Sequence, residues 1–220
     1  MVVNAAEEEE SDGPRMELVG LDAATGKRLW PQQLITDNDP KATLAYGGGL
    51  LYTQTDRGVV TAWEQATGKQ RWTRSIGSSS CEYPPTWYDG TLYTQDGRGT
   101  ALALRPSDGA ELWLAPLVDR GWSPVVVDDL GVWFGFDNAS YQLLDRRTGR
   151  ELRRCHVPDL LALGGGPIAR GAGALWLRSG DTDDERAVAY DQNTGAVLRS
   201  FPADATPAFG PGSTWRTGAS

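Results

Sequence analysis

Few residues of this 220-residue chain have the types and spacing that a reactive or metal-binding site requires. Acidic side chains lie close together in two places. Oxygen ligands of this kind suit Ca²⁺, but neither group has the spacing or the glycine of an EF-hand loop. We interpret both as solvated acidic loops, and only the second group is a weak candidate for a metal site. The groups are Asp37 with Asp39, and Asp181 with Asp183, Asp184 and Glu185.

Nucleophilic and imidazole side chains are equally sparse. His156 is the one histidine, so a His-rich zinc site cannot form. No GxSxG elbow or GxxxxGK[ST] phosphate loop occurs in the chain. Cys81 and Cys155 form no CxxC and are interpreted as free thiols, with a disulfide as the alternative. The sequence therefore predicts no catalytic residue, no cofactor-binding residue and no cofactor.

The secondary structure around these residues is predicted from a sequence repeat of about 41 residues. The three clearest copies are LDAATGKRLW, AWEQATGKQRW and ALRPSDGAELW, and LLDRRTGRELR and AYDQNTGAVLR are weaker. A period of this length is typical of propellers, solenoids or arrays. Each copy carries a turn glycine, at Gly26, Gly68, Gly109, Gly149 and Gly195.

A second feature of the repeat is an aromatic residue that follows a turn cluster such as DGTLY. Short runs rich in aromatic and β-branched residues alternate with turn residues, which favours strands over helices. Each copy thus contains about four antiparallel strands, the size of a propeller blade. We predict an all-β propeller of about five blades. The aromatic positions are Tyr52, Tyr93, Trp133, Trp176 and Trp215.

Each clear copy also ends in a tryptophan four residues after its glycine. We predict that Trp30, Trp72 and Trp113 dock between neighbouring blades, because large rigid rings bury much area there. Arg153 and Arg199 stand at this place in the last two copies. Those junctions should be looser, or should use Leu152 and Leu198 instead. The carboxylate four residues before most turn glycines should accept hydrogen bonds from the turn backbone.

Charge and termini limit the classes of function. The net charge of −8 opposes binding to nucleic acid or to an anionic membrane. Residues 1–15 carry four consecutive glutamates and have neither the basic region nor the apolar region of a secretory signal. We therefore expect a disordered acidic tail, followed by one domain over residues 16–220. No run is long and apolar enough to be a membrane helix. A soluble, cytoplasmic protein is expected, unless the chain was cut from a longer one.

The quoted motifs together resemble the PQQ-like β-propeller repeat, over roughly residues 16–217. That repeat occurs in quinoprotein dehydrogenases and in many non-enzymatic propellers. The dehydrogenases of this family have a vicinal Cys-Cys pair, a Ca²⁺ held by Glu, Asn and Asp, and a catalytic Asp. This chain has no Cys-Cys pair, so none of those site residues is carried over. The resemblance implies the fold and does not imply PQQ.

The first and last copies are incomplete in complementary ways. The first lacks its two inner strands, and the last, around Trp215, lacks its two outer ones. Met16 to Trp30 and Thr206 to Thr217 could therefore combine into one composite blade, which would leave no open sheet edge. The ring would then have four complete blades and a composite fifth. The alternative is an arc or a fragment of a ring with seven or eight blades.

These observations favour a non-catalytic propeller that serves as a binding, scaffolding or sensor module. A protein, peptide or small ligand would bind at a loop face or in the central channel. The alternative is a partial or degenerate quinoprotein oxidoreductase that uses PQQ with Ca²⁺. The ligand and the oligomeric state do not follow from the sequence.

Overall fold

A computed structural model gives the architecture of the chain. It describes residues 2–10, 13–37, 42–77, 83–120, 123–136, 140–156, 169–171, 174–179, 186–191, 193–194 and 196–202. All the regular elements among these residues are β-strands, in five antiparallel sheets. The prediction of an all-β fold made of four-stranded blades is confirmed.

Each sheet is built from strands that follow one another in the chain, and we number the sheets as blades 1 to 5. Blade 1 has three strands: β1 (Val2–Glu10), β2 (Gly13–Leu21) and β3 (Gln33–Asp37). Blade 2 has β4 (Ala42–Gly47), β5 (Leu50–Thr55), β6 (Val59–Glu64) and β7 (Gln70–Ser75). Blade 3 has β8 (Thr86–Tyr88), β9 (Thr91–Gln95), β10 (Thr100–Leu104) and β11 (Glu111–Pro116).

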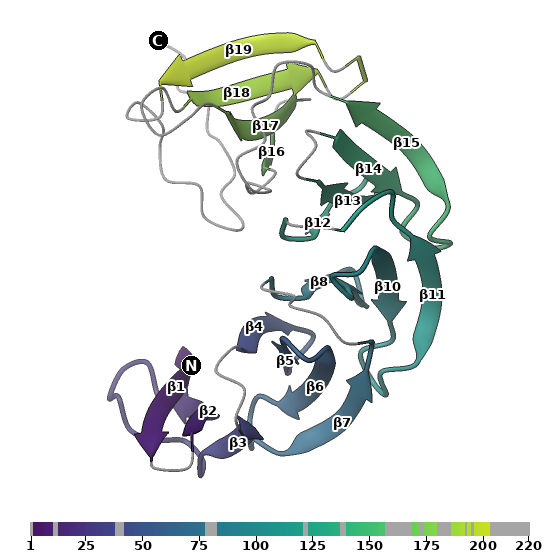
Figure 1. Ribbon diagram of the computed structural model, residues 1–220. Coiled ribbons are helices and arrows are strands. Elements are labelled where there is room, and N and C mark those ends of the chain that lie inside the picture. The colour runs from purple at the N-terminus through teal and green to yellow at the C-terminus, as the bar shows by residue number, and fades with distance from the viewer. Residues whose placement is uncertain are drawn as a thin grey trace.

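The last two blades repeat the same order. Blade 4 has β12 (Val126–Val127), β13 (Val132–Gly135), β14 (Ser140–Leu144) and β15 (Glu151–His156). Blade 5 has β16 (Ala169–Gly171), β17 (Ala174–Ser179), β18 (Arg186–Asp191) and β19 (Val197–Pro202). The blades follow one another along an arc, with β4, β8, β12 and β16 on its concave side and β7, β11, β15 and β19 on its convex side (Figure 1). Blades 1 and 5 form the two ends of this arc.

The repeated turn between the two outer strands follows from its sequence. In blade 4 the Asp145 carboxylate accepts hydrogen bonds from the Arg147 and Thr148 N–H groups and from the Thr148 hydroxyl, at 2.8–3.0 Å. The Thr148 hydroxyl and these amides hold the pKa of Asp145 below its usual value. Gly149 then takes a φ of +70°, which L side chains rarely adopt. Asp22 and Asp191 accept the same hydrogen bonds, so the predicted role is confirmed for these three aspartates. Glu64 differs, because its carboxylate accepts from the Thr67 hydroxyl and from Arg71.

Blade 1 differs from its prediction. Residues 1–15 are expected to be a disordered tail, whereas Val2–Glu10 forms β1, paired along its whole length with β2. Backbone pairing does not depend on the charge of the side chains, and charged residues are common on edge strands because they discourage pairing with other chains. The N-terminal segment therefore supplies three strands of blade 1 rather than two.

Several predictions fall outside the described residues. The C-terminal piece from Thr206 to Thr217, with Trp215, is among them, so the composite blade stays a prediction. The weak metal candidates Asp181, Asp183, Asp184 and Glu185 also lie outside, as do Cys81, Gly195, Asp39 and the side chain of Asp37.

Candidate functional site at the blade 3–4 rim

The motif tryptophans lie at the junctions between blades. The Trp72 side chain packs on the turn glycine of the next blade, where a Cβ built on Gly109 would lie 2.7 Å from Trp72 Cε3. Its indole N–H donates to the Pro106 carbonyl at 2.7 Å. Trp30 and Trp113 make the equivalent contacts with the turns of blades 2 and 4. Buried indoles with a satisfied N–H are packing groups, so these residues position the blades.

The aromatic residues of the second strands extend the same junctions inward. The ring centroids of Tyr52 and Trp72 are 6.2 Å apart, and those of Tyr93 and Trp113 are 6.0 Å apart. Trp133 is fully buried and packs with Val188 and Tyr190 of blade 5. These rings are core, and none is exposed as a stacking platform.

The junction between blades 4 and 5 has an arginine in place of the indole. Arg153 donates through Nη1 to Asn193 Oδ1, in the turn of blade 5, at 2.5 Å. Leu152 is 43% exposed and Leu198 is 52% exposed. The alternative prediction, that a leucine replaces the indole, is therefore wrong for Leu152, whereas for Leu198 it stays a prediction because the structure describes no blade after blade 5. Leu152 points the other way, because neighbouring residues of a strand face opposite sides of its sheet.

A cluster of polar contacts between two blades lies where the turns of blades 3 and 4 meet. It consists of Tyr88 and Asp89 at the β8–β9 turn, Asp129 and Leu130 at the β12–β13 turn, and Arg146 at the β14–β15 turn. We call these five residues the blade 3–4 rim. The three turns lie at the same end of their strands, since neighbouring strands are antiparallel.

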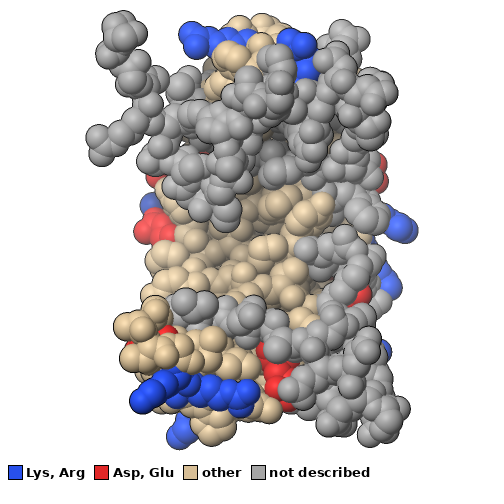
Figure 2. All heavy atoms as spheres, turned by 90° about the vertical axis from the view of Figure 1, so that its left-hand side faces the viewer, with Lys and Arg blue, Asp and Glu red and all other residues tan. Residues whose placement is uncertain are grey.

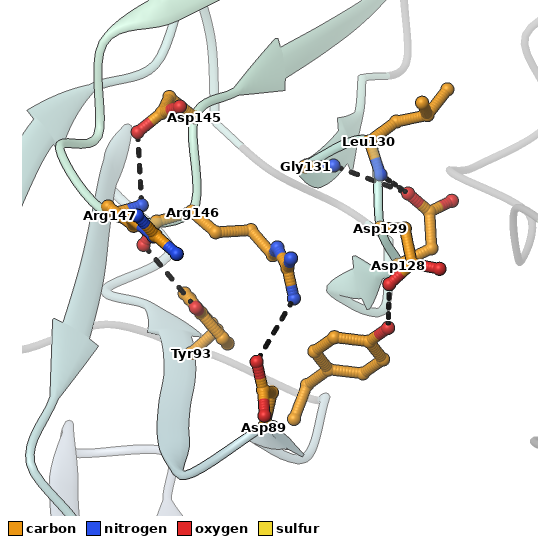
Figure 3. Close-up of polar contacts among 10 residues, drawn as sticks. Asp89, Tyr93, Asp128, Asp129, Leu130, Gly131, Asp145, Arg146 and Arg147 are labelled. Atoms are coloured by element: carbon orange, nitrogen blue, oxygen red, sulfur yellow. Dashed lines mark hydrogen bonds and ion pairs between the residues drawn. The ribbon is translucent and has the colours of Figure 1, made fainter.

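Direct contacts connect the rim residues across the two blades. The Tyr88 hydroxyl donates to Asp129 Oδ1 at 2.7 Å. The Arg146 guanidinium lies over the Tyr88 ring, 5.0 Å from its centroid, and its Nη1 is 3.7 Å from Asp89 Oδ2. Figure 3 shows Asp89 and Arg146 pointing toward each other from the two blades. The Arg146 side chain is only 25% exposed, whereas Asp89 is 81% exposed.

The backbone under the rim is held by further hydrogen bonds. Asp128 accepts from the Leu130 and Gly131 N–H groups through Oδ1 (Figure 3). It also accepts from the Trp133 indole through Oδ2. Tyr93 and Trp113 both donate to the Arg146 carbonyl. Asp89 has a φ of +47°, which aspartate tolerates better than most residues. The rim is therefore a rigid surface with exposed carboxylates and an exposed Leu130 side chain.

The side chains of the rim are of the kinds found at protein interfaces. Tyrosine and arginine are the residue types that dominate the energetics of protein interfaces. The Arg146 charge is already engaged by Asp89 and by the Tyr88 ring. The Tyr88 hydroxyl lies beside the Asp129 carboxylate, but its pKa is raised, which is the opposite of what an activated nucleophile requires. Among the residues described, no group of three His, Cys, Asp or Glu side chains could hold a metal ion.

The Tyr88 hydroxyl gives a direct test of the rim geometry. Its hydrogen bond to Asp129 raises the pKa of Tyr88, with burial adding to the effect. A raised tyrosine pKa means that the folded state holds the proton more tightly, so the associated stability is lost as pH rises above the ordinary value of about 10. We expect Asp129→Asn to lower the pKa of Tyr88, measured by NMR titration of labelled tyrosines with Tyr88→Phe to assign the signal. An unchanged pKa would contradict this contact.

No motif in the sequence marks the rim. Its residues come from three turns, and only their placement on neighbouring blades brings them together. His156 ends β15 and is exposed. In the part of the chain that the structure covers, no helix is long and apolar enough to cross a membrane.

Comparisons with known proteins fit this architecture. Residues 15–120 match the profile of a PQQ-like repeat family described as outer membrane protein assembly factor BamB. The crystal structure of BamB from Moraxella catarrhalis is similar, with a TM-score of 0.62 and 17% identity, over 90% of this chain and 67% of that one. No curated protein sequence matches the chain significantly.

Two computationally designed proteins are similar as well. Ika8 has a TM-score of 0.67 and 18% identity, over 90% of this chain and 57% of its own. Ika4 has a TM-score of 0.58 and 15% identity, over 81% of this chain and 99% of its own. The chain thus spans about two thirds of the BamB structure and less of Ika8. Residues 15–120 thus match the profile of the PQQ-like repeat family, and the four-stranded blades over the rest of the arc have the fold of its β-propellers.

Proposed function

We propose that this propeller is a non-catalytic module that binds a protein partner and serves as a scaffold for it. The observation that carries the proposal is the blade 3–4 rim, a rigid surface with interface-type side chains. Its exposed groups are two carboxylates and Leu130, which is 43% exposed. They suit a partner segment with basic and apolar side chains.

Two further observations support a scaffolding role. The family profile that matches residues 15–120 is named after an assembly factor, and not after an enzyme. The contacts of the motif tryptophans and of Arg146 are all used to hold blades together, so a partner would meet a surface that needs no rearrangement. Preformed surfaces bind with a smaller entropic cost.

The experiment is a comparison of two leucines with the same exposure. Leu130 is in the rim and Leu152 is on the outer strand β15, and both are 43% exposed. A photoreactive amino acid at each position should crosslink a partner in cells from position 130 and not from position 152. With the crosslinked partner purified, Leu130→Asp should weaken its binding about tenfold, and Leu152→Asp should leave the Kd unchanged. Equal crosslinking or equal affinities would refute the rim as the binding surface.

The absence of a cofactor is part of the same proposal. We expect titration with PQQ and Ca²⁺ to cause no change in visible absorbance and no shift in the midpoint of thermal unfolding. A ligand that binds the folded state at 100 times its Kd would stabilise it by about 2.7 kcal/mol. A saturable absorbance change would favour the quinoprotein alternative instead.

A further inference from the structure

The contact between consecutive blades has the same form along the arc. One blade presents a side chain of its outer strand, and the next blade presents its outer turn. The side chains are Trp30, Trp72, Trp113 and Arg153, and the turns are those of blades 2 to 5. We call the first element the plug and the second the seat.

The seat of blade 1 is open. Gly68, Gly109 and Gly149 are all buried under an indole of the preceding blade, whereas Gly26 is exposed. A Cβ built on Gly26 would meet nothing within 4 Å, although the φ of Gly26 is +68° as in the other turns. Among the residues that the structure describes, no side chain covers the blade 1 seat.

The plug of blade 5 is open as well. Arg199 has the same position in blade 5 as Arg153 in blade 4. Arg153 pairs with Leu143, the partner of Trp133, and Arg199 pairs with Ala189, the partner of Trp176. Arg199 is exposed, and Phe201, on the same face of β19, is 39% exposed and stacks on Trp176 at 6.1 Å. The sheet face that would meet a following blade therefore has a solvent-accessible outer strand.

We propose that copies of this chain associate head to tail, with the outer strand β19 of one copy on the blade 1 turn, Asp22–Gly26, of the next. Both halves of the contact are present in one chain. The blade 1 turn has Ala24 where the blade 5 turn has Asn193, so the arginine would meet the Asp22 carboxylate instead of an amide oxygen. Blades 1 and 5 lie apart at the two ends of the arc (Figure 1), so a second copy can make the contact without a change in the tightly packed junctions.

The blade 4–5 junction is a template for the charges of this contact. There Arg153 lies close enough to Asp191 to help lower the pKa of that carboxyl, and it donates to Asn193. Asp22 stands at the same place in blade 1 as Asp191 in blade 5. Arg199 of one copy would then face Asp22 of the next, which gives an attraction between opposite charges.

Other charges at the ends oppose the association at low salt. Lys27 and Arg28 are exposed beside the seat. Figure 2, which views the open side of the arc, shows Lys and Arg side chains at both of its ends. Salt screens exposed charges of both signs, so the association is to be measured near physiological ionic strength.

The first measurement is analytical ultracentrifugation of the full chain over a range of concentrations. We expect reversible, concentration-dependent association. Two variants should each abolish it: Arg199→Glu, which puts a carboxylate against Asp22, and Gly26→Asn, which fills the seat with a residue that tolerates positive φ. Matched controls are Leu198→Glu, on the other face of β19, and Gly49→Asn, at an exposed turn with a φ of +79° and open space. Both controls should associate like the unmodified chain.

The decisive step is to mix the two blocked variants. Arg199→Glu keeps a free seat and Gly26→Asn keeps a free plug, so a mixture has one intact contact and should form a dimer that neither variant forms alone. This pattern is specific to a heterologous, head-to-tail interface. A chain that stays monomeric at every concentration, as closure of its own ring would require, overturns the proposal. So does a mixture that stays monomeric.

This inference is independent of the proposed function. Leu130→Asp alters the rim and neither end of the arc, so it should leave the association unchanged. Loss of partner binding without loss of self-association, or the reverse, separates the two.

Discussion

Replacing Trp72 by alanine should lower the free energy of unfolding by about 3–5 kcal/mol, the range for deletion of a large buried aromatic side chain. Trp72 is 8% exposed, lies against Tyr52, covers Gly109 and donates to the Pro106 carbonyl. The substitution removes the packing of the blade 2–3 junction and leaves that carbonyl without its indole donor. The measurement is equilibrium unfolding in urea, followed by the fluorescence of the remaining tryptophans and by circular dichroism.

Leu152→Ala is the matched control for Trp72→Ala. It also truncates an apolar residue of an outer strand, but Leu152 is 43% exposed. Surface substitutions of this kind usually change stability by less than about 0.5 kcal/mol. If both variants lose the same stability, the indole junctions do not hold the blades together. A broad transition in Trp72→Ala alone would mean that the two parts of the arc unfold separately, because each repeat contacts only its neighbours.

The sequence was sufficient for the blade because the repeat encodes a local structure. The Asp145 carboxylate, the Thr148 hydroxyl and Gly149 close one turn within five residues, and the strands on either side follow from it. A pattern that recurs at a fixed spacing reports the same local geometry each time. The strand order within each blade could therefore be predicted.

The sequence was insufficient where a feature depends on contacts between distant segments. The four glutamates at the N-terminus predict disorder by composition, yet backbone pairing with β2 makes that segment a strand. Likewise, Asp89 and Arg146 are 57 positions apart, and neither stands out in its own repeat. Only the stacking of blades 3 and 4 brings their side chains together at the rim.

The sequence shows directly that the last two junctions differ from the others, but the spacing of the repeat does not say how they are packed. Arg153 and Arg199 stand where the indole is expected, and we interpreted this as a looser junction or a role for the neighbouring leucines. In the structure Arg153 reaches the blade 5 turn, where Asn193 offers a side-chain acceptor. The indoles of the other junctions donate instead to backbone carbonyls, those of Gln65, Pro106 and Arg146.

Gly68→Ala should destabilise the chain much more than Gly26→Ala, although the two glycines have nearly the same backbone conformation. Their φ angles are +69° and +68°. Alanine at either position has the strain of a left-handed conformation, about 1–2 kcal/mol. At Gly68 the new methyl group would also lie 2.5 Å from Trp30 Cδ2, closer than atoms can approach, whereas at Gly26 it would meet open space.

We therefore expect Gly26→Ala to cost about 1 kcal/mol and Gly68→Ala about 3 kcal/mol, since overpacking adds about 1–3 kcal/mol to the backbone strain. The measurement is urea unfolding at a protein concentration where the chain is monomeric. The double variant Gly68→Ala with Trp30→Ala isolates the clash: its stability should be close to that of Trp30→Ala less the backbone strain alone. Equal losses for the two single variants would mean that the Trp30 ring moves aside at little cost, and the glycine would then be required only by the turn and not by the indole that lies on it.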